Sequence, residues 1–494
     1  MGRGQRTTHC RYNFPTMATR RNIVFVHPDL GIGGAERLII DAAVGLQSNG
    51  HKITILTSYR DTNHCFEEAR DGTLDVRVRG DAIFPPSLFG RFAILCTILR
   101  QLSLVASTVP RELPTLAPDV IIVDQLSACI PFFRLLYPKA KVLFYGHYPD
   151  RLLVQQEVGS LRKVLKKLYR LPFDAFEGWS TGCADGVVVN SKYTRSVFRQ
   201  TFPDMKKREL KVVYPCVDTS EDERATQDSN IPLLPNRKIL LSINRFERKK
   251  NLALAINAYA GLSPTERSQS ILILAGGFDP RNAENALTHS SLQSLADSLH
   301  LTHTTLRSPS IATLTTLSET DQQANILFLL SIPSTLKSTL LQQAKILIYT
   351  PSNEHFGIVP LEAMLFRIPV LATNTGGPLE TIYDGRTGWL RSPEKVDAWT
   401  EVLRKGLISS SEESLRKMGE MGRERVLKEF SREKMTKELE GEVERLIKIP
   451  GKLRPGVVPE WMIIPFVGLL VLGMLVLLAL GMMVLGMGVN RIHG

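Results

Sequence analysis

The chain has 494 residues, of which 43% are hydrophobic and 22% are charged, and its formal net charge is +12. The length exceeds that of one ordinary domain and predicts two, and the apolar content allows sizeable buried cores. The positive charge indicates an anionic partner, which can be nucleic acid, an acidic membrane surface or a phosphorylated substrate. Six scattered cysteines without a C-x-x-C spacing argue against a disulfide framework or a zinc site.

The amino-terminal part predicts one α/β domain. Residues 1–21 are basic and lack the apolar core of a secretory signal, so we expect a disordered lead-in. From residue 22 onward, short buried strands alternate with stretches of helical apolar spacing. The predicted strands read NIVFVHP, HKITILTS, DVIIVDQ, KVLFYGH and DGVVVNS. This alternation predicts a parallel sheet with helices on both faces, over residues 22–220.

A second unit of the same kind follows a break. Residues 221–237 are polar, acidic and interrupted by prolines, which indicates an interdomain linker. The alternation restarts over residues 238–430, with strands at KILLSINR, ILILAGG, ANILFLLS, KILIYTP and IPVLATN. Residues 303–323 are rich in Ser, Thr and Leu and are expected to be a variable insertion, and residues 431–449 a helix that returns toward the amino-terminal domain. The predicted fold class is therefore α/β, with two doubly wound Rossmann-like domains facing a cleft.

The carboxyl-terminal stretch has the composition of a membrane anchor. From Trp461 to Val489 no residue is charged, and the run is long enough for one tilted transmembrane helix of about 20–25 residues. Four cations between residues 445 and 454 precede it, and only Arg491 follows it. By the positive-inside rule, we expect a transmembrane segment over residues 461–489 that leaves the larger part of the chain in the cytosol.

A glycine turn, GIGGAE (residues 31–36), follows the first predicted strand and opens a helix. A dinucleotide-binding fingerprint would require a third glycine at Glu36 and an acidic residue at Ser58, so a Rossmann dehydrogenase is disfavoured. Such a turn lets a bulky ligand or a phosphate approach the backbone at a helix N-terminus. The alternative is a tight turn that uses glycine only for its backbone conformation.

A cluster of cations follows the first strand of the second unit, where Arg245, Arg248, Lys249 and Lys250 lie within six residues. Arginine forks and lysine point charges at the end of a strand suit a diphosphate. The chain has no D-x-D motif and no carboxylate cluster suited to Mg²⁺, so we expect no metal ion. Cations and helix N-termini would then stabilise a departing nucleoside diphosphate. The alternative is a solvated basic surface turn.

Two glutamates, Glu354 and Glu362, follow the buried strand AKILIYTPS and have seven residues between them. We expect Glu354 on the loop at the end of the strand and Glu362 in the first turn of the helix PLEAMLFR. Free backbone N–H groups and the positive dipole end favour anionic ligands at a helix start, and open α/β sheets bind ligands at this edge. The alternative is that a glutamate near a helix start merely stabilises the dipole.

Three further segments are compatible with both a functional and a structural role. His147 follows the strand KVLFYG and is expected at the edge of the first domain that faces the cleft. Residues 161–170 combine apolar residues at helical spacing with five cations, which fits a helix lying on an anionic membrane as well as a charged helix packed on the core. Residues 82–107 could form a second membrane contact.

Three motifs in order resemble those of the retaining GT-B glycosyltransferases: GGAER (residues 33–37), RFERKKN (residues 245–251) and EHFGIVPLEAM (residues 354–364). Longer stretches are similar to the eukaryotic alpha-1,3/1,6-mannosyltransferase family of the dolichol-linked oligosaccharide pathway, over about residues 22–450. They read HPDLGIGGAERLIIDAA, FYGHYPDRLL, INRFERKKNLALAINA, LAGGFDPRNAENALTH and TNTGGPLETI. In FYGHYPD the chain has glycine where that family more often has cysteine.

The resemblance implies substrates and a location. The donor would be GDP-mannose, and the acceptor a mannosyl-chitobiosyl unit on dolichyl diphosphate, at the cytosolic face of the endoplasmic reticulum membrane. Two mannoses would be added, one α1,3 and one α1,6, with retention. The described mechanism is a front-face attack in which the leaving phosphate helps to take the acceptor proton. No cofactor is implied, and other early mannosyltransferases of the pathway are implied as partners.

The resemblance also implies roles for residues of this chain. Arg245 and Lys250 would hold the donor diphosphate, Glu354 would contact the mannose, and Glu362 would bind the ribose. The implied catalytic set is Glu354, Lys250 and Arg245 together with His147. The other implied substrate-binding positions are Gly33 and Gly34 on the acceptor side and Phe356 and Gly357 beside the donor.

Other functions stay open at this point. The chain could be another cytosolic-face GT-B glycosyltransferase with a lipid acceptor, such as a different mannosyltransferase of the pathway or the N-acetylglucosaminyltransferase that acts on phosphatidylinositol. The sequences around HYPD and RFERKKN argue against both of these enzymes. A non-catalytic membrane-anchored subunit is disfavoured by the complete set of Arg245, Lys250, Glu354 and Glu362. Nucleic acid is disfavoured as a partner because aromatic residues are not interleaved with the basic runs.

Overall fold

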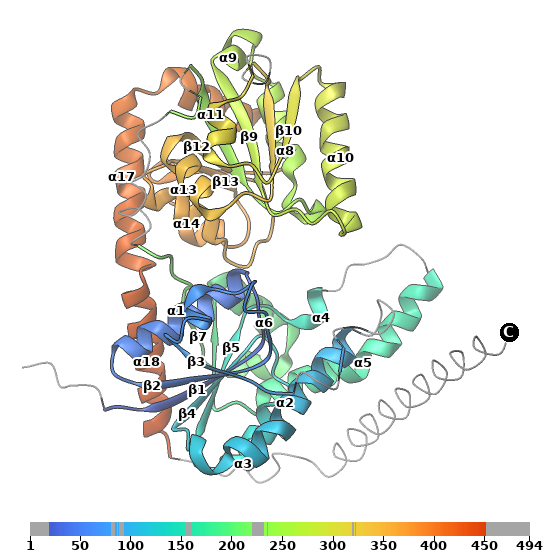
Figure 1. Ribbon diagram of the computed structural model, residues 1–494, viewed down its shortest axis with the longest axis vertical. Coiled ribbons are helices and arrows are strands. Elements are labelled where there is room, and N and C mark those ends of the chain that lie inside the picture. The colour runs from blue at the N-terminus through green and yellow to red at the C-terminus, as the bar shows by residue number, and fades with distance from the viewer. Residues whose placement is uncertain are drawn as a thin grey trace, which may run out of the picture.

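Two seven-stranded parallel sheets lie one above the other in the computed structural model (Figure 1). The structure describes residues 19–450 except 81–83, 86, 88–92, 154–159, 220–231, 235, 319–320 and 322. Most of the expected lead-in and most of the expected linker therefore lie outside the described residues. The prediction of two doubly wound α/β domains is confirmed.

The first sheet has the strand order β3-β2-β1-β4-β5-β6-β7, and its neighbouring strands are parallel. Its strands are β1 (Asn22–Leu30), β2 (Lys52–Arg60), β3 (Asp75–Val78), β4 (Val120–Asp124), β5 (Lys141–Gly146), β6 (Gly186–Val189) and β7 (Leu210–Val212). In the centre of the sheet, Phe25 of β1 pairs with Ile55 of β2 on one side and with Ile122 of β4 on the other. The central strands are buried on both faces, which explains why their sequences read as continuous apolar runs.

Helices cover both faces of the first sheet. They are α1 (Gly34–Ser48), α2 (Ala93–Leu116), α3 (Ile130–Leu136), α4 (Asp150–Leu153), α5 (Ser160–Gly182) and α6 (Lys192–Thr201), with 3-10 turns at Glu67–Ala69 and Pro203–Lys207. One face packs against Leu38 and Ile39 of α1, and the other against Leu104 of α2, Phe133 of α3 and Phe198 of α6. The segment 161–170, predicted to be helical, lies within α5. The second half of the segment 82–107 lies within α2.

The second sheet repeats this plan with the order β10-β11-β9-β8-β12-β13-β14, again parallel. Its strands are β8 (Lys238–Ile243), β9 (Ser270–Gly276), β10 (His303–Arg307), β11 (Ile326–Leu330), β12 (Ala344–Tyr349), β13 (Val370–Thr373) and β14 (Gly388–Arg391). In both sheets the chain begins in a central strand, builds one half and then crosses over to the other half, although in the second sheet β11 lies between β9 and the edge strand β10.

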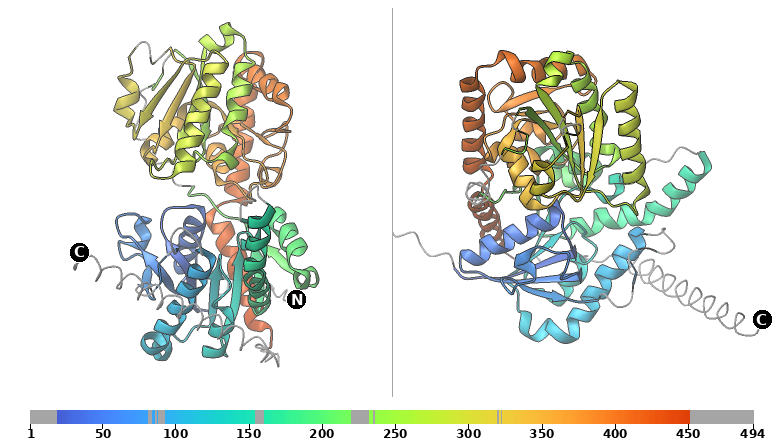
Figure 2. Two further views of the ribbon diagram at one scale, coloured as in Figure 1. Left: turned by 90° about the vertical axis from the view of Figure 1, so that its right-hand side faces the viewer. Right: turned by 45° about the horizontal axis from the view of Figure 1, so that its top comes forward.

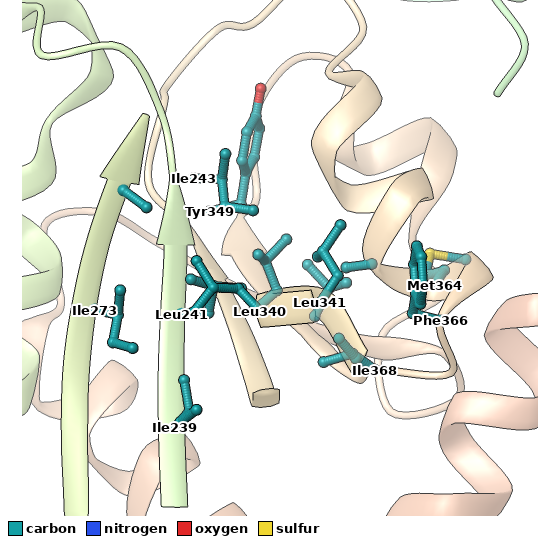
Figure 3. Close-up of a cluster of buried hydrophobic side chains, with 14 of the residues drawn as sticks. Ile239, Leu241, Ile243, Ile273, Leu340, Leu341, Tyr349, Met364, Phe366 and Ile368 are labelled. Carbon is teal, nitrogen blue, oxygen red and sulfur yellow. The ribbon is translucent and has the colours of Figure 1, made fainter. Parts of the chain in front are cut away.

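Helices also flank the second sheet. They are α8 (Leu252–Ala260), α9 (Pro264–Ser268), α10 (Ala283–Ser298), α11 (Ile311–Thr315), α13 (Ser334–Gln343), α14 (Ile358–Leu365), α15 (Pro378–Thr381), α16 (Val396–Arg404) and α17 (Glu412–Glu429), with short turns at Arg248–Lys250 and Lys405–Ser409. The last helix of the described residues, α18 (Arg432–Lys448), packs on the first sheet instead. Figure 3 shows part of the core between β8, α13 and α14, with Leu241, Leu340 and Met364 among its buried side chains. The Tyr349 hydroxyl points away from this cluster.

The expectation that residues 303–323 form a variable insertion is wrong for their first part. His303–Arg307 form β10, which pairs in parallel register with β11, so that His303 lies opposite Ile326 and Arg307 opposite Leu330. β10 is an edge strand, and its residues are half-buried or exposed. An edge strand with one wet side can be polar, which is why the sequence HTTLR lacked the apolar signal of its neighbours.

The last helix, α18, returns from the second domain to the first, and α17 and α18 run along the same side of the molecule (Figure 1, Figure 2). Arg432 of α18 pairs with the buried Asp41 of α1 at 2.9 Å. Glu440 contacts His51 at 3.0 Å, and Glu444 binds Arg21 at 2.9 Å. The carboxyl-terminal helix is thereby fixed to the first domain by charged contacts along its length.

No helix among the described residues is both long and apolar enough to cross a membrane. The predicted transmembrane segment, residues 461–489, lies outside the described residues, and its prediction is therefore untested.

The close packing of α1 on α18 gives a stability prediction. A Cβ atom at Gly45 would lie 2.0 Å from the Thr436 hydroxyl oxygen, whereas one at Gly441 of α18 would meet nothing within 4 Å. We expect Gly45→Ala to destabilise the protein by about 1–3 kcal/mol through overpacking. Gly441→Ala should be neutral or stabilise it by up to about 1 kcal/mol, because alanine is the better helix former. Thermal unfolding of the full chain measures both, and equal melting temperatures would contradict the packing argument.

Candidate functional site

The carboxyl ends of the two sheets face each other across the domain boundary. Tyr148, which follows β5 of the first domain, stacks on His355, which follows β12 of the second, with ring centroids 3.8 Å apart and planes 11° apart. The Ser191 hydroxyl, after β6, donates to the backbone oxygen of His355 at 2.5 Å. Parallel α/β sheets bind their ligands at this edge, so residues from both domains can act on one ligand here.

Glu380 of α15 makes a second tie between the domains. Its carboxylate accepts the backbone N–H groups of Lys192 and Tyr193 at 2.8 and 2.7 Å, and the hydroxyl of Tyr214 at 2.9 Å. The two N–H groups belong to the first turn of α6, where a carboxylate is electrostatically favoured. Glu380 lies in the stretch TNTGGPLETI that resembles the family, but nothing in the sequence indicated that its carboxylate binds α6 of the other domain.

Lys250 and Glu354 form an ion pair at the centre of the second sheet's carboxyl edge. Lys250 follows β8, Glu354 follows the adjacent strand β12, and Lys250 Nζ lies 2.6 Å from Glu354 Oε2. The side chains are 12% and 24% exposed. Burial alone would raise the pKa of Glu354, but the charge and the hydrogen bond of Lys250 outweigh it and leave that pKa below its ordinary value. Glu354 is therefore a fixed anion beside a fixed cation.

The backbone around this ion pair is held by its neighbours. The Thr350 hydroxyl donates to the carbonyl oxygen of Lys250 at 2.7 Å, and the Gly377 N–H donates to that of Glu354 at 2.8 Å. A Cβ atom at Gly376, whose φ is +67°, would lie 2.5 Å from the Glu354 carbonyl oxygen. Glycine is therefore needed for the loop after β13 to support the Glu354 loop this closely.

Glu362 lies in α14, one residue beyond its first turn, so the expectation that it sits in the first turn is wrong. Its Oε1 pairs with Lys337 Nζ of α13 at 2.6 Å. Its Oε2 is buried and accepts no hydrogen bond from the described residues, which leaves one acceptor available to a ligand. Lys337 was missed because its helix, STLKSTLLQQ, carries no distinctive motif.

Arg245 stands apart from the Lys250–Glu354 pair. Its guanidinium is 62% exposed and pairs with Glu247 at 3.0 Å, and Lys249, also exposed, contacts the same carboxylate at 3.2 Å. Glu247 thus offsets part of the positive charge of the basic turn, and Lys250 of the same turn contacts Glu354. An exposed arginine held by one surface contact can change partners at small cost.

The glycine turn of the first domain faces the second domain. Gly33 is the N-cap of α1, and a Cβ atom there would lie 2.3 Å from the carboxylate of Glu36. A Cβ atom at Gly34 would lie 3.9 Å from Ile358 Cδ1, at the start of α14. The start of α1 therefore lies next to the start of α14, and a side chain at Gly34 would enter the space between them.

His147 is held from behind by a buried carboxylate. Its Nε2 lies 2.5 Å from Asp124 Oδ1, and Asp124 Oδ2 lies 2.7 Å from Nδ1 of His27. Asp124 and His27 are fully buried, while His147 is 17% exposed. Burial disfavours the charged forms of Asp124 and His27. His147 and His27 nevertheless keep the pKa of Asp124 low, and Asp124 raises the pKa of His27. Asp124 and His147 stand at the ends of their predicted strands, but the sequence does not show that the two side chains contact each other.

Phe356 and Gly357 shape the loop that carries Glu354. The Phe356 ring is 3% exposed and packs on Tyr214 and Phe430, with centroid distances of 5.6 and 5.8 Å. Its ring therefore has a packing role in the core. Gly357, with φ of +85°, is the N-cap of α14, and a Cβ atom there would come within 3.0 Å of the Tyr349 hydroxyl.

Within the part of the chain that the structure describes, no three His, Cys, Asp or Glu side chains are grouped as a metal site would require. The prediction that no metal ion takes part stays a prediction, to be tested by chelation.

Two family descriptions match the chain, one for each domain. Residues 32–221 match Glycosyltransferase Family 4, and residues 223–425 match Glycosyl transferases group 1. The boundary between the two matches coincides with the passage from the first sheet to the second.

Several relatives match over most of their length. The chain is 52% identical to alpha-1,3/1,6-mannosyltransferase alg-2 of Neurospora crassa, over 87% of this chain and 91% of that protein. It is 44% identical to the alpha-1,3/1,6-mannosyltransferase ALG2 of Saccharomyces cerevisiae, over 87% of this chain and 85% of that protein.

Solved structures share the fold at low identity. A sucrose-phosphate synthase from Thermosynechococcus elongatus superposes with a TM-score of 0.64 at 19% identity, over 86% of this chain and 98% of its own. WaaG, a glycosyltransferase involved in lipopolysaccharide biosynthesis, superposes with a TM-score of 0.53 at 17% identity, over 85% of this chain and 99% of its own. At such identity the likeness supports the two-domain glycosyltransferase fold alone.

The stack of Tyr148 on His355 gives a prediction about the domain boundary. An aromatic pair contributes about 0.5–1.5 kcal/mol beyond its buried area, so Tyr148→Ala should weaken the contact between the domains by that amount. We expect a longer mean distance between spin labels placed one on each domain. Tyr148→Phe, which keeps the ring, should leave the distance unchanged, and so should Tyr59→Ala, which removes an exposed ring elsewhere in the first domain. An unchanged distance in Tyr148→Ala would show that the stack does not hold the domains.

Proposed function

This chain belongs to the family of alpha-1,3/1,6-mannosyltransferases, and from that premise we propose that it transfers mannose from GDP-mannose to a mannosyl-chitobiosyl unit on dolichyl diphosphate. It adds one α1,3-linked and one α1,6-linked mannose with retention, early in the assembly of the N-glycan precursor. The observation that carries the proposal is the Lys250–Glu354 ion pair, because it sets a cation for a phosphate and a carboxylate for a sugar side by side.

Lys250 and Arg245 serve the donor diphosphate. The Lys250 ammonium, 2.6 Å from Glu354, is a fixed point charge that attracts a phosphate oxygen. Arg245 is exposed and pairs with Glu247, and it can turn its guanidinium to the second phosphate. The two cations together balance the charge that develops on GDP as it leaves.

Glu354 and Glu362 serve the two sugars of the donor. Glu354, whose pKa is held below its ordinary value, stays ionised and accepts hydrogen bonds from mannose hydroxyl groups. Glu362 keeps Oε1 on Lys337 and offers the unpaired Oε2 to a ribose hydroxyl. A carboxylate that is already ion-paired orients the mannose and is a poor nucleophile, which supports a mechanism without a covalent intermediate.

The transfer step needs no group beyond these residues and the substrates. The bond between mannose C1 and the phosphate oxygen of GDP breaks, and a bond forms between C1 and the acceptor oxygen on the same face. The acceptor proton passes to the phosphate oxygen that has just left. The cations lower the barrier by stabilising that phosphate, which is the work a metal ion performs in other transferases.

The acceptor side is formed by the first domain. The Gly33–Gly34 turn carries no side chains at the start of α1, which favours the approach of an acceptor glycan there, and His147 lies at the same edge of the sheet. The net charge of +12 favours an anionic lipid diphosphate and an acidic membrane surface. With the predicted segment 461–489 as anchor, the site would face the cytosol at the endoplasmic reticulum membrane, where other early mannosyltransferases of the pathway are candidate partners.

A direct assay tests the assignment. We expect purified full chain, with GDP-mannose and the lipid-linked one-mannose acceptor, to give a product heavier by two hexoses in mass spectrometry. Linkage-selective mannosidases should find one α1,3 and one α1,6 bond, and UDP-glucose should not replace GDP-mannose. The assignment fails if no such product forms. EDTA should leave the rate unchanged, and a loss of rate that Mg²⁺ or Mn²⁺ restores would refute the metal-free mechanism.

The role of Lys250 has a separate test. We expect Lys250→Ala to lower the transfer rate by about 10²–10³-fold, as removal of one group that stabilises developing charge commonly does. Lys417→Ala, which removes an exposed lysine of α17, is the matched control and should keep the wild-type rate. The melting temperature of both variants shows that the protein is folded. A wild-type rate in Lys250→Ala would exclude a role for this ammonium at the diphosphate.

A further inference from the structure

Three side chains at the carboxyl edge of the first sheet form a continuous chain of hydrogen bonds. His27 lies near the end of β1, Asp124 ends β4, and His147 follows β5, and these strands are neighbours in the sheet. Asp124 uses one carboxylate oxygen for His27 Nδ1, at 2.7 Å, and the other for His147 Nε2, at 2.5 Å. The chain runs from the fully buried His27 to the partly exposed His147.

Such a buried carboxylate is costly unless it is fully paired. Transfer of an ionised group out of water carries a penalty of several kcal/mol even after relaxation of the protein. Two imidazole N–H donors compensate Asp124 here, and both are available whether each imidazole is neutral or protonated. The carboxylate in turn decides which nitrogen of each ring carries the proton in the neutral form.

The arrangement leaves one nitrogen of His147 for a ligand. Because Nε2 donates to Asp124, Nδ1 is the remaining ring nitrogen, and it makes no hydrogen bond to any described residue. His147 immediately precedes Tyr148, which stacks on His355, which in turn follows Glu354. His147 is thus one residue away from the stacked pair that joins the two domains.

We propose that Asp124 is a positioning residue of the transfer reaction, which holds His147 with Nδ1 toward the domain boundary, and that His27 holds Asp124 in turn. The ligand of Nδ1 is a sugar hydroxyl group of the donor or the acceptor. The inference rests on the proposed function, since it gives His147 its orientation in that reaction. Asp124 and His27, both buried, act through His147 and touch no substrate.

A coupling experiment tests this role. Asp124→Asn keeps the shape but replaces one acceptor by an N–H₂ group, which forces one imidazole into the wrong tautomer. We expect kcat to fall about 10–100-fold, which is the range found for carboxylates that orient metal-binding histidines. The KM for GDP-mannose should be unchanged. His147→Gln places an amide nitrogen near the position of Nε2 and lacks Nδ1, and should lose a similar factor. Because Asp124 acts through His147, the double variant should lose no more than His147→Gln alone.

Three results would overturn the inference. One is a double variant in which the two losses multiply, since Asp124 would then act independently of His147. Another is an unchanged kcat in Asp124→Asn. The third is a loss that appears as a raised KM together with a lowered melting temperature, which would indicate a structural role. Asp119→Asn, on the opposite edge of the same sheet, is the matched control. A lack of transfer by the wild-type protein would refute the proposed function instead, which keeps the two failures distinct.

If Asp124→Asn does not fold, variants of His27 provide the same test, because His27 is one hydrogen bond further from the ligand than Asp124. His27→Asn places an amide N–H near the position of Nδ1 and can still donate to Asp124, whereas His27→Leu cannot. We expect His27→Asn to keep most of the wild-type kcat and His27→Leu to lose about 10-fold or more. Equal kcat values in the two variants would overturn the inference.

Discussion

Both domains depend on one electrostatic constraint at the point where their strand order reverses. In each sheet two adjacent central parallel strands end side by side, and the chain leaves them in opposite directions. In the second domain Lys250 and Glu354 bridge this point, and in the first domain His27 and Asp124 bridge it. Each bridge joins an acidic to a basic side chain within 2.7 Å, in a place where an unpaired charge would be costly. The strand ends are thus locked together where ligands of open α/β sheets bind.

The two bridges are brought into one site by the residues next to them in the sequence. His147, the more exposed partner of Asp124, is followed in the sequence by Tyr148, and Glu354 is followed by His355. Tyr148 and His355 stack on each other. Burial lowers the pKa of His355 to about 4, so the His355 side of the stack is neutral near neutral pH. Glu380 and α18 add further ties between the domains. A change in the domain contact therefore moves Glu354 relative to His147.

The sequence predicted the parts of this arrangement that local pattern determines. Apolar runs and their spacing predicted the two parallel sheets, and the order of motifs indicated the family to which the chain belongs. Partners that lie far apart in the chain could not be predicted, because a single sequence does not show which distant residues meet. Asp124 is 97 residues from His27, and Glu380 is 188 residues from Lys192. The edge strand β10 was missed for another reason, since its wet side removed the apolar signal.

Under the proposed function, the Lys250–Glu354 pair gives a way for the site to take up a negatively charged donor. Before the donor binds, the two side chains compensate each other, so neither is a buried unpaired charge. A donor phosphate can replace the carboxylate as the partner of Lys250, because an ammonium group has three donors and no fixed fork. On this proposal Glu354 then has an oxygen available for mannose hydroxyl groups, and these replace the hydrogen bond that it gave up. In this exchange Glu354 gives up an ion pair for hydrogen bonds from neutral hydroxyl groups while the diphosphate takes over the cation, so binding the diphosphate and orienting the sugar become one event.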